Sequence, residues 1–167
     1  MRRRNGFSLI ELLIVVAIIL IIAAIAIPNL IRARMAANES SAAAAERTLV
    51  TSMVTYSGAY PDVGYAPALA NLGPSGADPC APSPAAACLI DGVLAGGTKS
   101  GYTFTAAGVN PVNGFFSGFL TTAIPVTLNT TGVKGFCAID ENVIRYITPS
   151  PAAITYAGCQ TYGPVGD

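Results

Sequence analysis

The chain has 167 residues, of which 52% are hydrophobic and only 11% are charged, and its nine basic and nine acidic residues cancel. It contains no histidine, which excludes His-ligated zinc or haem, a Ser–His–Asp triad and a Cys–His nucleophile pair. Three of the nine basic residues crowd the extreme N-terminus, so six basic and nine acidic residues remain beyond it, a formal charge of −3. This balance gives no support to binding of nucleic acid.

A long apolar segment begins at Phe7. Arg2, Arg3 and Arg4 precede it and hold this end in the cytoplasm by the positive-inside rule. The segment, residues 7–27, contains 21 residues. As an α-helix it would span roughly 30 Å, which is enough to cross the hydrocarbon core of a bilayer. The sequence therefore predicts an exported or membrane-anchored protein.

Glu11 is the one charged residue in this segment. A carboxylate in an apolar span costs roughly 2.5–3.5 kcal/mol on insertion scales, so such residues are usually functional. One alternative is an anchor whose acid simply reaches the membrane surface. Another is an ordinary secretory signal cut after residues 24–26, AIA, which would start the mature chain at Ile27, place Pro28 second and discard Glu11.

Residues 6–13, GFSLIELL, closely resemble the processing signal of type IV prepilins and type II secretion pseudopilins. The resemblance covers about the first thirty residues: a short basic leader, a Gly–Phe junction and an acid at the fifth position after it. It implies that a prepilin peptidase removes residues 1–6 by cutting between Gly6 and Phe7, and methylates the new N-terminal amine of Phe7. It further implies that Glu11 neutralises this amine, in its own chain or in a neighbouring subunit, and so sets the register of assembly.

Pro28 follows the apolar segment and predicts a bend, because proline removes one helical hydrogen bond. Beyond it the sequence predicts that the helix continues, giving one helix of about 50 residues with an apolar half, 7–27, and an amphipathic half, 28–56. The amphipathic half carries an apolar stripe, and its charged residues are expected mainly to face away from it. The stripe consists of Met35, Ala42, Ala45, Leu49, Met53 and Tyr56, and the charged residues are Arg32, Arg34, Glu39, Glu46 and Arg47.

Residues 57–100 are rich in proline and glycine and predict a long irregular connection, whereas residues 101–167 carry the strand signals and a C-terminal tail. The expected strands are 101–105, 115–124, 135–139 and 143–147, the last two joined by a polar turn at 140–142. Three or four antiparallel strands packed on the amphipathic half of the helix give an α+β fold class. This arrangement is similar to the pilin fold.

Four cysteines, Cys80, Cys88, Cys137 and Cys159, lie beyond the helix. An even number in a chain with an export-type N-terminus indicates two disulfides rather than catalytic thiols. Four cysteines allow three pairings. The favoured one joins Cys80 to Cys88, closing a local loop, and Cys137 to Cys159, fastening the tail to the sheet, where many pilins have a similar C-terminal loop.

Other chemistry finds little support in the sequence. Asp140 and Glu141 are too few acids for a calcium cage, and neither a metal site nor a cofactor is predicted. Glycosylation sequons at residues 38–40 and 129–131 are short patterns that often occur by chance. Aromatic residues are too sparse in the helix for a stacked conduction path. Because the chain has no histidine and shows no catalytic constellation, the sequence predicts a protein that is not an enzyme.

The leading hypothesis is a structural subunit of a type IV pilus, a bacterial inner-membrane precursor that polymerises with itself into an extracellular filament. The resemblance implies three partners: a prepilin peptidase and methylase, an inner-membrane assembly platform and, indirectly, a cytoplasmic ATPase. Two alternatives belong to the same family, a periplasmic pseudopilin of a type II secretion system and a minor pilin forming an adhesive or DNA-binding tip. An exported enzyme or binding domain behind an ordinary signal peptide is the alternative outside the family.

Overall fold

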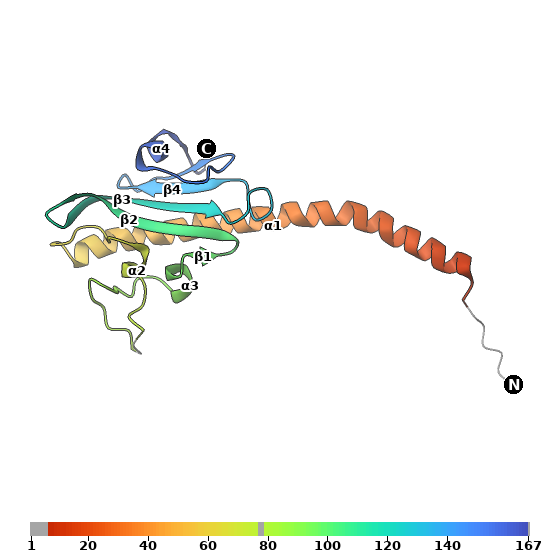
Figure 1. Cartoon of the computed structure of the whole chain (residues 1–167), viewed down its shortest axis with the longest axis horizontal. Coiled ribbons are helices and arrows are strands. Elements are labelled where there is room, and N and C mark those ends of the chain that lie inside the picture. The colour runs from red at the N-terminus through yellow and green to blue at the C-terminus, as the bar shows by residue number, and fades with distance from the viewer. Residues whose placement is uncertain (1–6, 77–78, 167) are drawn as a thin grey trace. The chain divides into compact units, whose positions relative to one another are not determined.

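A computed structural model of the chain describes residues 7–76 and 79–166 (Figure 1). One long helix, α1 (Leu9–Ala59), precedes a six-stranded antiparallel sheet, which confirms the predicted α+β fold class. The chain divides within α1 into two compact units. We call the part up to Arg34 the N-terminal unit and the part from Met35 onward the globular unit.

The N-terminal unit contains the apolar part of α1. Every large hydrophobic side chain from Phe7 to Ile31 is exposed. An 18-residue window of α1 reaches a mean hydropathy of 3.3, so the helix is long and apolar enough to cross a membrane. The helix continues through Pro28 without interruption. A helix that is apolar on all sides needs lipid or other helices around it, and the described part of the chain supplies neither.

The sheet is a meander in which each strand pairs with its neighbour in sequence. Its strands are β1 (Thr98–Lys99), β2 (Tyr102–Val112), β3 (Phe115–Pro125), β4 (Gly135–Ile139), β5 (Ile144–Ile147) and β6 (Gly163–Pro164). The expected number of three or four strands is wrong because β1 and β6 have only two residues each, too few for an alternating pattern to reveal them. The predicted hairpin around residues 140–142 is present as β4 and β5.

The β2–β3 hairpin reaches further than its hydrophobic pattern indicates. Strand β2 was expected to end at Thr105, but it continues to Val112, which pairs with Phe115. Between them, Asn113 and Gly114 have positive φ angles of 52° and 86°. A two-residue type I′ turn requires this backbone, and Asn-Gly is its strongest sequence signal. The dipeptide was therefore sufficient to locate this turn from the sequence.

The proline-rich connection between α1 and the sheet is more ordered than expected. It contains two short helices, α2 (Leu69–Leu72) and α3 (Gly92–Ala95). The carboxylate of Asp91 caps α3 by accepting a hydrogen bond from the backbone N–H of Leu94 at 2.8 Å. Three leucines of these helices are buried in the main core: Leu69, Leu72 and Leu94. Burial of these side chains is what fixes an otherwise irregular segment to the globular unit.

The main core of the globular unit lies between α1 and one face of the sheet. Its largest fully buried side chains are Leu49, Met53, Tyr56, Leu72, Leu94, Tyr102 and Phe119. Both buried tyrosines satisfy their hydroxyl groups: Tyr56 donates to the carbonyl of Pro84 at 2.6 Å, and Tyr102 to that of Lys134 at 2.9 Å. Two hydrogen-bonded phenols therefore connect this core to loops outside it.

A second, smaller core contains Cys137, Ile139, Ile154 and Cys159. Its residues come from β4 and from the C-terminal tail, which contains the helix α4 (Tyr156–Thr161). Thr155 caps α4 by accepting a hydrogen bond from the backbone N–H of Gly158 at 3.1 Å. The structure has the favoured disulfide pairing, Cys80 with Cys88 and Cys137 with Cys159. The second bond ties α4 directly to β4.

We expect replacement of both Cys137 and Cys159 by alanine to lower the free energy of unfolding by roughly 3 kcal/mol, because the bond restricts the unfolded chain and anchors the tail. These cysteines are 22 residues apart, whereas Cys80 and Cys88 are 8 residues apart. The corresponding double substitution at Cys80 and Cys88 is the matched control and should cost about 1 kcal/mol less. Urea unfolding of the detergent-solubilised chain measures both; a smaller loss at Cys137 and Cys159 than in the control contradicts the expectation.

Candidate assembly site

The residues predicted to act in processing and assembly gather in the N-terminal unit. Gly6 lies outside the described residues. Phe7 is 83% exposed immediately before α1, and Glu11 is exposed in the first turn of that helix. Pro28 is inside α1, and its side chain is exposed. Glu11 and Pro28 thus lie on one helix, with the carboxylate in its first turn, and Phe7 precedes that helix.

Glu11 caps its own helix. Its Oε2 accepts a hydrogen bond from the backbone N–H of Ser8 at 2.9 Å. Since Ser8 precedes the first helical residue and Glu11 is the third, this contact is one half of a capping box, S-x-x-E. A carboxylate in the first turn also interacts favourably with the helix dipole. Residues 8–11, SLIE, carry this signal in the sequence, so the capping role was open to prediction.

The amphipathic part of α1 packs on the sheet largely as expected, with one clear exception. Five members of the predicted stripe are buried: Ala42, Ala45, Leu49, Met53 and Tyr56. Glu46 was expected to face away from the stripe, and that expectation is wrong because its side chain is completely buried. The residue lies four positions after Ala42 and three before Leu49, so helical spacing places it on the stripe itself.

The carboxyl group of Glu46 is alone in this core. Neither of its oxygens has a hydrogen-bond partner in the part of the chain that the structure describes. The neighbouring hydroxyl of Thr121 donates instead to the carbonyl of Ala138 at 3.4 Å. Burial raises the pKa of Glu46 to about 8. The side chain is therefore mostly protonated, and uncharged, at neutral pH.

Glu39, also expected to face away, instead fastens a loop of the sheet to α1. Its Oε1 accepts hydrogen bonds from the backbone N–H groups of Val133 at 2.9 Å and Lys134 at 3.2 Å. Lys134 Nζ also lies 3.9 Å from Glu39 Oε2. The adjacent Asn38 donates from Nδ2 to the carbonyl of Thr131 at 2.8 Å. The β3–β4 connection is thereby held against the helix, and the amide of the first glycosylation sequon is engaged in the fold.

The two acids considered as calcium ligands have partners within the protein. Asp140 accepts a hydrogen bond from the Tyr156 hydroxyl, and this bond raises the pKa of Tyr156 to about 12. Glu141 forms an ion pair with Arg145 at 2.6 Å. Within residues 7–76 and 79–166, no group of three or more acidic or sulfur ligands gathers at a place that could hold a metal ion.

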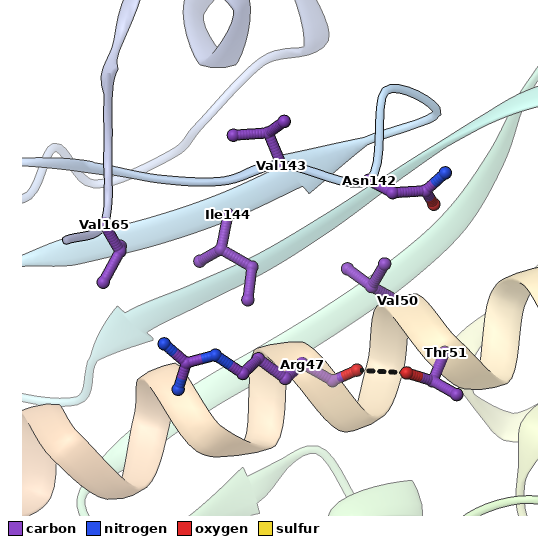
Figure 2. A pocket seen from close by; sticks show the side chains of 7 residues that line it. All are labelled: Arg47, Val50, Thr51, Asn142, Val143, Ile144 and Val165. Carbon is purple, nitrogen blue, oxygen red and sulfur yellow. Dashed lines mark hydrogen bonds between the residues drawn. The ribbon is translucent and has the colours of Figure 1, made fainter.

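Several hollows follow the exposed side of α1 in the globular unit, and Arg47 lines three of them. The hollow in Figure 2, of about 400 Å³, lies between α1 and the β4–β5 turn. Arg47, Val50 and Thr51 line it from the helix, and the opposite wall consists of Asn142, Val143, Ile144 and Val165. This surface contains no catalytic constellation among its lining residues, and its mixture of aliphatic side chains with one cation suits contact with another protein surface.

Comparison with known proteins identifies the N-terminal region. A family model described as "Prokaryotic N-terminal methylation motif" matches residues 1–27. The chain is 62% identical over 40 residues to the type IV wide pilus major component PilA4 of Thermus thermophilus. It is 42% identical over 76 residues to the type IV major pilin protein PilA of Myxococcus xanthus. In this region, the chain is similar to type IV pilins.

The similarity to these pilins is limited to part of each chain. The two matches cover 24% and 41% of this chain. They cover 30% and 34% of the relatives, so the chain spans about a third of the length of each relative. No solved structure matches the chain. The similarity to pilins therefore rests on the N-terminal motif and on the matched segments of the two relatives.

Proposed function

We propose that this chain is a pilin, a structural subunit of a type IV pilus, and that its activity is polymerisation rather than catalysis. The observation that carries the proposal is the methylation motif of residues 1–27, followed along the chain by a helix whose large apolar side chains are all exposed as far as Ile31. Both relatives are named as major pilus components, which supports the pilus over the pseudopilus of a secretion system. No observation favours an adhesive or DNA-binding tip.

Processing would begin at the cytoplasmic face of the inner membrane. A prepilin peptidase would cut between Gly6 and Phe7 and methylate the new amine of Phe7. Because the cut precedes the apolar segment, the mature chain keeps its anchor. The apolar half of α1 would then be surrounded first by lipid and, after an assembly platform and ATPase have moved the subunit outward, by the same helix of other copies.

Glu11 would exchange partners during this transfer. In the described state its carboxylate accepts a hydrogen bond from the Ser8 amide of its own chain. After cleavage, the cationic amine of Phe7 becomes available one helical turn away, in the same chain or in a neighbour. That amine carries a full positive charge, which the Ser8 amide does not, so its pairing with the Glu11 carboxylate of a neighbouring subunit would reward correct register.

Mass spectrometry of N-terminal peptides tests this proposal, with a sheared cell-surface fraction and the cell envelope examined side by side. We expect an N-methylated peptide that starts at Phe7 and is abundant in the sheared fraction. The same peptide confined to the envelope would assign the chain to a pseudopilus instead. A mature chain that starts at Ile27 would exclude both and leave an ordinary secreted domain.

A further inference from the structure

The charged side chains of the globular unit are almost all satisfied within the chain. The ion pairs are Lys99 with Asp91, Lys134 with Glu39, and Arg145 with Glu141. Asp140 is hydrogen-bonded to Tyr156, and Glu46 is buried. Among the described residues of this unit, Arg47 is then the one cation without an ion pair. Within residues 35–76 and 79–166, Asp62 is also the one exposed carboxylate that forms no ion pair and accepts no side-chain hydrogen bond.

Arg47 is placed where a second molecule can reach it. Its side chain is exposed and lines the hollow between α1 and the β4–β5 turn, with Ile144 and Val165 on the opposite wall (Figure 2). Val50 forms the apolar floor on the helix side and is itself buried. A carboxylate that enters this hollow would be partly removed from water, which strengthens its attraction to the guanidinium beyond that of a fully exposed pair.

Arg47 and Asp62 cannot satisfy each other within one chain. Asp62 lies in the turn that follows the end of α1 at Ala59, where its side chain is exposed. Twelve residues of helix separate Arg47 from Ala59, a rise of roughly 18 Å along the axis. An ion pair requires approach to about 4 Å. The two charges are therefore complementary, unpaired and displaced along the same helix.

We propose that Arg47 of one copy pairs with Asp62 of a second copy, in a contact between globular units that joins different patches of the two molecules. This inference rests on the proposed function, because it assumes that the chain polymerises. Each copy supplies one Arg47 and one Asp62, so the contact repeats at every added subunit. A heterologous contact of this kind generates an open helical filament unless its rotation closes into a ring.

Charge exchange in cells that produce the full-length chain tests this pairing. Arg47→Glu and Asp62→Arg should each reduce the sheared filament by at least about fivefold relative to the envelope pool, because each places like charges together at every contact. The double variant R47E/D62R restores opposite charges and should recover filament to within about twofold of the wild type. The neutral variants Arg47→Gln and Asp62→Asn, which keep the side-chain sizes, should give intermediate losses.

Arg34 provides the matched control. It is an exposed arginine without an ion pair in the described part of the chain, but it belongs to the N-terminal unit. R34E/D62R should leave the defect of Asp62→Arg unrelieved. Non-reducing electrophoresis of the envelope pool, showing both disulfides intact, confirms that each variant has folded.

Three results would overturn the pairing: wild-type filament yield in both single variants, a double variant as defective as the singles, or rescue by Arg34→Glu in place of Arg47→Glu. Absence of the wild-type chain from the sheared fraction would be a different failure. It would refute the proposed pilus function before the pairing was reached.

Discussion

A chain carrying Glu11→Gln is expected to be processed and to accumulate in the envelope, but to fall at least about a hundredfold in the sheared filament. Loss of a charge-assisted bond in an apolar surrounding costs on the order of 3 kcal/mol per subunit, which corresponds to this factor. Glutamine keeps the acceptor that caps the helix, since Gln also serves at this position of a capping box. The substitution therefore removes the charge of Glu11 while leaving its contact with Ser8 available.

Glu11→Leu is the companion variant, because it removes the charge and the cap together. Equal assembly defects in the two variants would assign the effect to the charge, and quantitative immunoblots of sheared and envelope fractions provide the comparison. If the glutamine variant assembled like the wild type while the leucine variant did not, helix capping would be the role of Glu11. Pairing with the amine of Phe7 would then be wrong.

The stability of the globular unit is expected to fall as the pH rises, because of Glu46. Its pKa is raised from 4.5 to about 8 in the folded chain. Between these two values the folded state holds a proton that the unfolded state has released, so the free energy of unfolding decreases with pH by up to about 1.4 kcal/mol per pH unit. The contribution of Glu46 to the free energy of unfolding is fully present below pH 4.5 and is lost by about pH 8. The chain should be on the order of 3 kcal/mol less stable at pH 8 than at pH 5 from this residue alone.

Glu46→Leu should remove this dependence, because leucine has a similar volume and no group to ionise. Urea unfolding of the detergent-solubilised chain at several pH values, followed by tyrosine circular dichroism, gives the comparison with the wild type. Glu141→Gln is the control for a surface acid and should retain the wild-type slope. Parallel slopes for the wild type and Glu46→Leu would show that Glu46 is ionised in the folded chain.

The sequence was most informative where a periodic pattern coincided with a single structural role. The apolar run after Phe7, the stripe on α1 and the alternating residues around the polar turn at 140–142 each predicted an element that is present. Strand β2 was predicted too short because Gly108, Asn110 and Pro111 interrupt the alternation of apolar and polar residues. These residues have little intrinsic preference for a strand, and pairing with β3 stabilises the strand there instead.

Charged residues on the helix were the other place where prediction from sequence failed. The helical spacing of Glu46 predicts a buried side chain, whereas its charge predicts an exposed one. In the structure the side chain is buried, as the spacing predicts. Protonation lowers the free-energy cost of burying the Glu46 side chain, and a hydrophobic pattern cannot reveal this protonation. The role of Glu39 depends on loop amides 94 and 95 residues away in sequence, so no local pattern could have indicated it.

The meander order of the sheet has a consequence for how this chain acquires its structure. Because every strand pairs with the next one along the chain, each pairing closes only a short loop, which favours rapid formation. Docking of α1 is the long-range step, since it must meet strands that lie far from it in sequence. We therefore expect the sheet to form early and the membrane-tethered helix to dock onto it last. Until then the aromatic face of the sheet, including Tyr102 and Phe119, would be open to solvent and to any chaperone that meets the folding chain.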